Sequence, residues 1–571
     1  MTSLLGGASI SQEEQQKNDR HQPKIVLFVL AFLVLYIYLF THASESLNLP
    51  LPQNLSESLG LDIDHVFDDD GNVDSYLYIP LNQNFPTNDD ERLVLFIGVA
   101  IAFLLVYFLP LKHKQNSLVC SSLVIIFVLY GIEGVSGLLC AHILVYLVLH
   151  PANHFRTSIA WFPGFFGFWA FYPYVNLDLF TIFQSLVAGV LTFLVYRLLI
   201  LRFLKSPTVA KVLRIIVIQS ALITVLVGFL LEGWLTESWK LALGVLLFFW
   251  HWERLFLYHI DFQDGKIPEN ISLMTYLSIF LTPGQIANWS WGVTIGQGYA
   301  YTVNNFLCKD KNLLIVSGLK LWAISIFYLI FGEWIQIHLI DFFNDQGIQV
   351  YRRIEHMSFY FVSGKDINTS TILLTTLIAL MKWTFSWGGV MHFKVGLWRV
   401  CGYQVDPYFN FPWLSTNLVS LWSRFTFHYR EFLVRAFYYP VFFKFFKGHT
   451  HLRIFAATMA AACFGNLIWG HITEAGFYYG IKRDSLFGSL EQWPYFVLLG
   501  IGITASEFWL LHKKKTSRKP WTPDKFFFCD ILSAYATLQF YALIHIFVNT
   551  HNKATVTDSL LLLLAGLGIR F

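Results

Sequence analysis

Two histidines, each with a glutamate three residues later, stand inside apolar segments of this chain. They are His471 with Glu474, in NLIWGHITEAGFYYG, and His428 with Glu431, in WSRFTFHYREFLVRAFYYP, where Arg424 also lies four residues before the histidine. Residues three or four apart share one face of an α-helix, so each glutamate could hold one ring nitrogen and leave the other free. A histidine held in this way can act as a general base near neutral pH. The alternative is a structural histidine that bonds between two helices.

A metal centre is another use of such pairs, and the sequence argues against it. Di-metal helix bundles combine Glu-x-x-His pairs with two further glutamates from other helices, and those carboxylates are missing. His449 and His451 stand close together only in a polar stretch, and the six cysteines show no C-x-x-C spacing. The chain also lacks a G-x-S-x-G elbow and a P-loop. We therefore predict no metal site, and nothing supports serine or nucleotide hydrolysis.

The composition around these residues is that of a membrane protein. Hydrophobic residues make up 55% of the chain and charged residues 13%, against about 25% charged in soluble domains. Runs of roughly 17–25 apolar residues can span a bilayer. We predict such spans at 25–41, 92–110, 117–150 (two spans, broken near Gly131–Gly134), 158–174, 178–203, 212–231, 239–257, 313–341, 370–400, 454–480, 492–512, 528–549 and 556–571. Ionisable residues at membrane depth cost at least ~2.5–3.5 kcal/mol each, so those after about residue 245 indicate where the function lies.

The distribution of charge predicts the orientation of the chain. Residues 42–91 contain 11 Asp or Glu and no Lys or Arg, whereas basic clusters such as HKKKTSRK at 512–519 fall between predicted spans. Loops rich in Lys and Arg stay in the cytoplasm, which places the N-terminus inside and 42–91 outside. The first span lacks a small-residue cleavage site and is interpreted as an anchor. We expect a multi-pass protein of the inner or plasma membrane with a cytoplasmic N-terminus.

Five segments after about residue 245 follow one another in a recognisable order. They are HWERLFLYHIDFQDGKIPEN with the later TPGQI, WTFSWGGVMHFKVGLWRVCGY, PYFNFPW with the Trp422 and Arg424 pair, the REF and YP of REFLVRAFYYP, and GNLIWGHITEAGFYYG. In this order the chain resembles the membrane-bound O-acyltransferase family. Within that family it is most similar to the bacterial branch of alginate O-acetyltransferases and teichoic-acid D-alanyl transferases. The last segment resembles the one with the family's catalytic histidine, and His471 stands there, two residues after Trp469.

The resemblance implies an all-α polytopic fold, a ring of about 11–14 transmembrane helices around a central tunnel. It implies that an acyl donor enters from the cytoplasmic side and a hydroxyl acceptor from the other side, with His471 where they meet. A base at hydrogen-bonding distance from a hydroxyl contributes ~10²–10⁴-fold to its reaction. The thiolate of a thioester is a good leaving group, so no covalent enzyme intermediate is required. We expect no bound cofactor, and an acyl thioester, acyl-CoA or acyl-carrier protein, as co-substrate.

These patterns divide the chain into six parts. They are a cytoplasmic tail (1–24), a first transmembrane helix (25–41), an acidic extracytoplasmic segment (42–91), N-terminal transmembrane helices (92–244), a catalytic core like that of the family (245–480) and C-terminal transmembrane helices (481–571).

We therefore predict an O-acyltransferase that moves an acetyl or other short acyl group to an extracytoplasmic hydroxyl, that of a cell-envelope polysaccharide. His471 and His428 are the predicted catalytic residues, and the substrate-binding candidates are Glu474, Arg424, Asn410 and Trp469. The expected partners are the bilayer, the donor, which a soluble carrier protein could deliver, and a saccharide or lipid acceptor, with no nucleic acid. The alternatives are a lipid-hydroxyl acyltransferase and a transporter or export component without catalysis, since intramembrane charges serve transport as well.

Overall fold

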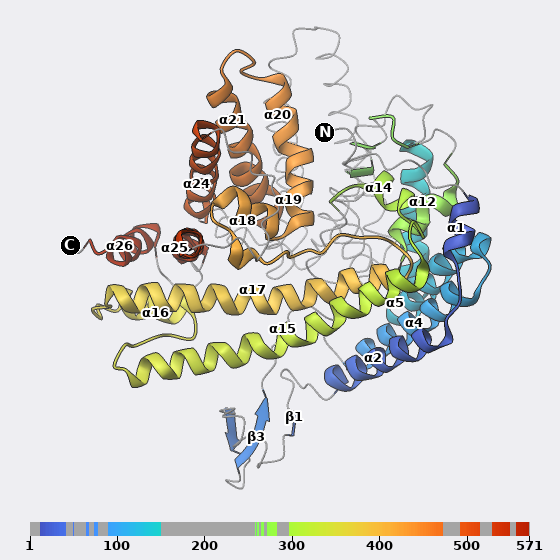
Figure 1. Cartoon of the computed structure of the whole chain (residues 1–571), viewed down its shortest axis with the longest axis horizontal. Coiled ribbons are helices and arrows are strands. Elements are labelled where there is room, and N and C mark those ends of the chain that lie inside the picture. The colour runs from blue at the N-terminus through green and yellow to red at the C-terminus, as the bar shows by residue number, and fades with distance from the viewer. Residues whose placement is uncertain are drawn as a thin grey trace, which may run out of the picture.

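The positions of these residues come from a computed structural model of the chain. It describes residues 12–41, 49–50, 64–67, 73–77, 89–149, 257–258, 260–261, 264–267, 271–282, 296–471, 492–513, 528–548 and 555–569. This part of the chain is mostly helical, as predicted (Figure 1). Three of its helices are long and apolar enough to cross a membrane, namely Lys311–Asp345, Trp493–His512 and Asp530–Val548. The predicted spans 158–174, 178–203, 212–231 and nearly all of 239–257 lie outside the described residues.

Two long helices, α15 (Lys311–Asp345) and α17 (Thr369–Val400), form the central layer and lie side by side over most of their length (Figure 1). Their close approach uses glycine. A Cβ at Gly396 would overlap the ring of Trp322, whose Nε1 donates to the Phe393 carbonyl oxygen at 3.1 Å. Both helices match predicted spans, 313–341 and 370–400. The residues of α17 from Trp387 to Val400 are all buried.

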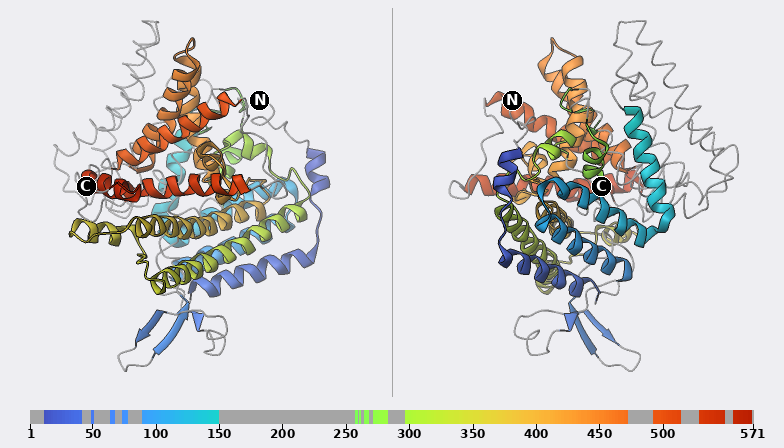
Figure 2. Two further views of the ribbon diagram at one scale, coloured as in Figure 1. Left: turned by 60° about the vertical axis from the view of Figure 1, so that its left-hand side comes forward. Right: turned by 90° about the vertical axis from the view of Figure 1, so that its right-hand side faces the viewer.

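A second group of helices, α2 (Pro23–Thr41), α4 (Asp89–Phe108) and α5 (Leu111–Leu149), packs beside the first half of α15 (Figure 2). The prediction of two spans within 117–150 is wrong, because α5 is one continuous helix of 39 residues. A glycine inside a helix costs only ~1 kcal/mol and no proline interrupts this segment, so Gly131–Gly134 do not end the helix.

A small antiparallel sheet lies between the end of α2 and the start of α4 in sequence, inside the segment predicted to be extracytoplasmic. Its strand order is β1 (Leu49–Pro50), β3 (Val73–Leu77), β2 (Asp64–Phe67), with Asp64 opposite Tyr76. The sheet projects beyond the helices (Figure 2).

A third group packs above α17 and contains two π-helical stretches (Figure 1). Its members are η3 (Pro412–Leu414), α18 (Leu418–Arg424), α19 (Phe427–Leu433), η4 (Val434–Tyr438), α20 (Tyr439–Lys444), α21 (Thr450–Thr458), η5 (Met459–His471) and α24 (Trp493–His512), and close by lie α25 (Phe528–Ile544), η7 (His545–Val548), α26 (Val556–Gly566) and α16 (Ile354–Val362). Within the predicted span 454–480, α21 passes directly into η5, which is a π-helix and not an α-helix. Apolar periodicity does not distinguish i→i+4 from i→i+5 bonding, so the sequence held no signal for it.

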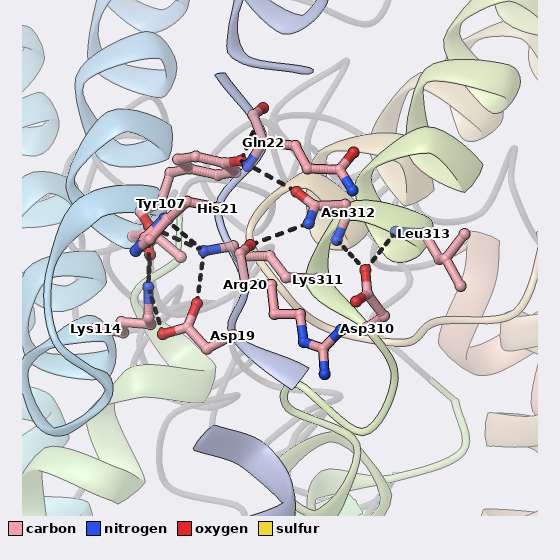
Figure 3. Close-up of polar contacts among 11 residues, drawn as sticks. Asp19, Arg20, His21, Gln22, Tyr107, Lys114, Asp310, Lys311, Asn312 and Leu313 are labelled. Carbon is pink, nitrogen blue, oxygen red and sulfur yellow. Dashed lines mark hydrogen bonds and ion pairs between the residues drawn. The ribbon is translucent and has the colours of Figure 1, made fainter. Parts of the chain in front are cut away.

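The N-terminal segment packs against the first turns of α5 and α15, where ion pairs hold it. Asp19 accepts from two buried ammonium groups, those of Lys311 at 2.6 Å and Lys114 at 3.2 Å (Figure 3). Lys114 also donates to the Val106 and Tyr107 carbonyl oxygens, which belong to the last turn of α4 and need partners there. The segment from α1 (Gln12–Asn18) to α2 is thereby held against three helices.

Candidate functional site

His428 lies at the beginning of a short helix, α19, which an interruption of the helical backbone separates from α18. α18 ends at Arg424, Thr426 has a left-handed backbone (φ 51°), and α19 begins at Phe427. The expectation that Arg424 lies one helical turn before His428 is therefore wrong, because the two residues belong to different helices. A non-glycine residue with positive φ is uncommon, and such strained positions gather at functional sites.

The His428 side chain is only 2% exposed, and its two ring nitrogens differ. Nε2 lies 2.9 Å from the backbone carbonyl oxygen of Asp406. A carbonyl oxygen can only accept, so Nε2 carries the proton and Nδ1 has the free lone pair. Nδ1 is buried and has no hydrogen-bond partner among the residues that the structure describes. The site thus presents an unused acceptor nitrogen on a neutral imidazole.

The partner of His428 differs from the predicted one. Glu431 does not hold the ring but forms an ion pair with the neighbouring Arg430. The expected histidine–glutamate contact is wrong for this pair, because the Glu431 carboxylate pairs with Arg430 and the ring bonds to a backbone carbonyl.

Asn410 and Arg424 are brought close to His428 mainly through their backbones. The Asn410 N–H donates to the Arg424 carbonyl oxygen at 2.9 Å, and Nη1 of Arg424 donates to the Asn410 carbonyl oxygen at 3.2 Å. Two residues before Asn410, the Tyr408 carbonyl oxygen accepts from the Phe427 N–H at 2.9 Å. These bonds hold the loop before α18 against the start of α19, while the Asn410 side chain stays exposed.

A glycine–glutamine–glycine turn, Gly296–Gly298, covers the same face of the helical run from α19 into η4. Gln297 donates from Nε2 to Oδ2 of Asp406 at 2.8 Å. A Cβ at position 296 would overlap the His428 carbonyl oxygen, and Gly298 has a φ of 103° and no room for a side chain beside Arg435. Sequence reasoning missed this turn, although a polar residue between two glycines in an apolar region was a usable signal.

A buried ion pair fixes this turn from the other side. Asp261 and Arg435 are 1% and 6% exposed and bond to each other. Arg435 also donates to the Gln297 carbonyl oxygen at 3.1 Å, and Asp261 accepts from the Ala300 N–H at 2.9 Å, in the first turn of α14 (Tyr299–Asn304). Sequence reasoning missed this pair too, because its members lie 174 residues apart.

Arg399, in the last turn of α17, holds the peptide just before Asp406. Its Nε and Nη2 donate to the Val405 carbonyl oxygen at 2.9 and 2.8 Å, while Nη1 reaches Oγ of Ser317 on α15 at 3.3 Å. Asp406 is therefore fixed between Arg399 and Gln297 where its carbonyl meets His428.

The other predicted residues lie on or beyond the neighbouring π-helix. Trp469 and His471 belong to η5, which packs against both α19 and η4, with the Phe437 and Phe464 rings 6.2 Å apart. In i→i+5 bonding, the backbone partner one turn before His471 is Asn466 and not Leu467. Glu474 lies outside the described residues, so its predicted contact with His471 stays a prediction.

One further histidine in the described region has the same kind of unused atom. His392, on the buried half of α17, is 4% exposed, and its Nδ1 has no partner among the described residues. Its ring packs edge-on against Tyr328. Within the part of the chain that the structure describes, no group of three His, Cys, Asp or Glu residues could hold a metal ion.

Chemically, this arrangement provides a buried nitrogen that can accept a proton from a small polar group. No family model matches the chain, and no curated protein matches it.

Proposed function

We propose that this protein is a membrane O-acyltransferase that transfers a short acyl group from a thioester to a hydroxyl of an extracytoplasmic acceptor, a saccharide of the cell envelope. His471 is the general base of the proposal, and Nδ1 of His428 is proposed as a second proton acceptor. The observation that carries the proposal is the buried, neutral His428 with Nδ1 unpartnered among the described residues.

The step needs only a base and a dry site. The acceptor oxygen attacks the thioester carbonyl carbon while a histidine nitrogen takes the hydroxyl proton. The carbon–sulfur bond then breaks, and the thiolate leaves and takes up the proton. Burying the site among helices keeps water from competing with the hydroxyl.

Two observations favour acyl transfer over transport as the function of this protein. The first is the order of five segments that resembles the acyltransferase family. The second is that two ion pairs lie close to His428 among the described residues: Asp261 with Arg435, and Arg430 with Glu431. Charges bound in this way position groups, whereas an ion pathway requires groups that can release their partner.

The first experiment measures ester-linked acyl groups on envelope glycans in cells that express His471→Ala, His428→Asn or wild-type protein at equal membrane levels. We expect ester content to fall by ~10²-fold or more in His471→Ala and by ~10-fold or more in His428→Asn, because a positioned base contributes ~10²–10⁴-fold.

His545→Asn is the matched control. His545 is a half-buried histidine that also has one nitrogen on a backbone carbonyl, Nδ1 on Tyr541 at 2.6 Å, but it lies on η7. It should retain wild-type esters. Unchanged esters in both site variants, with protein present and folded, would overturn the proposal.

A further inference from the structure

We propose that Gln297 and Arg399 are positioning residues that hold His428 in the Nε2-protonated tautomer and so keep Nδ1 available to the acceptor hydroxyl. The inference rests on the proposed function for its catalytic meaning, but the tautomer itself can be observed without any reaction. Gln297 acts through the Asp406 side chain and Arg399 through the Val405 carbonyl, in the peptide just before Asp406.

The contact that selects the tautomer comes from a loop with no regular structure of its own. Residues 401–411 connect α17 to η3 without a helix, and the Asp406 carbonyl lies in the middle of this connection. A carbonyl in a free loop would move away from the ring, and the imidazole would then sample both tautomers. The Gln404 N–H holds the first half of the loop through the Asn305 carbonyl oxygen at 3.1 Å, and two side chains hold it at Val405 and Asp406.

Gln297 is the first anchor and acts on the Asp406 side chain. Its amide donates to Oδ2 at 2.8 Å, and its own carbonyl is held by the buried Arg435 at 3.1 Å. Arg435 follows His428 on the same continuous helical run, through α19 into η4. Arg435, which holds the anchor, and the histidine thus share one helical run, and this restrains the position of Asp406 relative to the ring.

Arg399 is the second anchor and acts on the backbone. Two of its nitrogens converge on the Val405 carbonyl oxygen, and a third reaches Ser317, so the guanidinium ties the loop to both α17 and α15. A lysine keeps the charge but offers no planar fork and cannot make this set of bonds.

The tautomer matters because only an unprotonated nitrogen can take a proton. Where a triad aspartate is replaced by asparagine, the geometry stays intact but the wrong tautomer lowers kcat ~10⁴-fold. In the proposed site the selecting group is a carbonyl, which accepts only from a protonated Nε2.

The test is nitrogen-15 NMR of histidine-labelled protein in lipid bilayers, with His428→Asn used to assign the signal by subtraction. In the wild type, we expect one neutral form of His428, with Nε2 protonated and Nδ1 unprotonated. In Gln297→Ala/Arg399→Lys, we expect signals of both tautomers or a signal broadened by exchange.

Gln336→Ala is the matched control, since Gln336 is a buried glutamine that donates to the Arg352 carbonyl oxygen at 2.9 Å on the opposite half of α15. It loses a comparable bond and should leave the His428 signal unchanged. All variants are compared at matched elution volume in detergent, which shows that they are folded.

The kinetic arm measures acyl transfer by the same membranes. We expect kcat of the double variant to fall ~10–100-fold with little change in KM for the thioester, because a misplaced base affects the chemical step. Arg399→Lys alone should retain more activity than Arg399→Gln.

The outcomes separate the two proposals. If the double variant keeps a single Nε2-protonated form, or if the wild type carries its proton on Nδ1, the positioning role is overturned, whatever the ester assay shows. If the tautomer is lost as expected but His428→Asn and His471→Ala leave esters unchanged, the positioning role stands and the acyltransferase is wrong.

Discussion

At the scale of single residues, the site depends on polar groups that a membrane interior would reject if they were alone. Asp261 and Arg435 are buried together, and each has a second partner, Ala300 for the carboxylate and Gln297 for the guanidinium. Removing one member of such a pair leaves an uncompensated charge, whereas removing both does not. The pair therefore serves to fix the turn at Gln297 and adds little net stability of its own.

The first stability prediction concerns this pair. Asp261→Ala should lower the free energy of unfolding by about 3–5 kcal/mol, because it leaves Arg435 charged and buried. Asp261→Ala/Arg435→Met should recover part of the loss. Thermal unfolding in detergent measures both.

Asp264 provides the control. It pairs with Lys266 at 2.8 Å, but it is 48% exposed. An exposed pair contributes about 0–1 kcal/mol, so Asp264→Ala should unfold nearly as the wild type does. An equal loss in the two alanine variants would contradict the role given to the buried pair.

At the scale of elements, the site depends on how closely α15 and α17 pack, since Arg399 sits at the end of one and reaches Ser317 on the other. Where helices have no hydrophobic driving force between them, small residues permit close approach and van der Waals contact. Gly396 supplies such a position against Trp322.

Gly396→Ala should therefore destabilise the helix pair. The added methyl group would overlap Trp322 at Cδ1 and Nε1 and displace the indole from its bond to Phe393, at an overpacking cost of about 1–3 kcal/mol. Thermal unfolding and Trp fluorescence would report the change. Ala323→Val is the control: position 323 is next to Trp322 in sequence but is exposed, so the larger side chain should be tolerated.

At the scale of the whole molecule, the N-terminal segment is connected to the candidate site through a chain of contacts. Gln15 and Asn18 donate to the Phe306 and Leu307 carbonyl oxygens at 2.9 and 3.1 Å. The Leu307 N–H in turn donates to the Gly402 carbonyl oxygen at 2.8 Å, at the start of the loop that carries Asp406. Asp19 holds this segment in place through its ion pairs with Lys114 and Lys311 (Figure 3).

Asp19→Asn should release the N-terminal segment, because Lys114 and Lys311 lose the carboxylate that they share. Trypsin cleavage after the exposed residues Lys17 and Arg20 should accelerate on the order of tenfold, as cleavage follows the population of the open form. Glu13→Gln, an exposed position on α1 just before Asp19, should have no effect. Equal cleavage in all three proteins would show that the network does not hold the segment.

The same attachment should depend on pH. Nδ1 of His21 lies 3.2 Å from the Lys311 ammonium and must be the unprotonated acceptor there. Desolvation first, and then the charge of Lys311, hold the pKa of His21 below its ordinary value of 6.5. The released segment binds the proton at higher pH than the docked one, so docking is complete above about pH 6.5 and weakens as the pH falls below it. Trypsin cleavage of wild type should rise in that range, and His21→Gln should remove the rise.

The sequence by itself determined that this is a helical membrane protein, because the length and apolarity of a span are local properties. It also marked His428 as a buried polar residue of interest, since a histidine in an apolar segment is visible without a structure. It did not reveal that η5 is a π-helix or that α5 is unbroken, because apolar content is the same in each alternative. Only the tertiary structure decided what His428 bonds to. Its partner Asp406, the anchors Gln297 and Arg399, and the Asp261–Arg435 pair come from separate stretches of the chain, and packing alone brings such residues together.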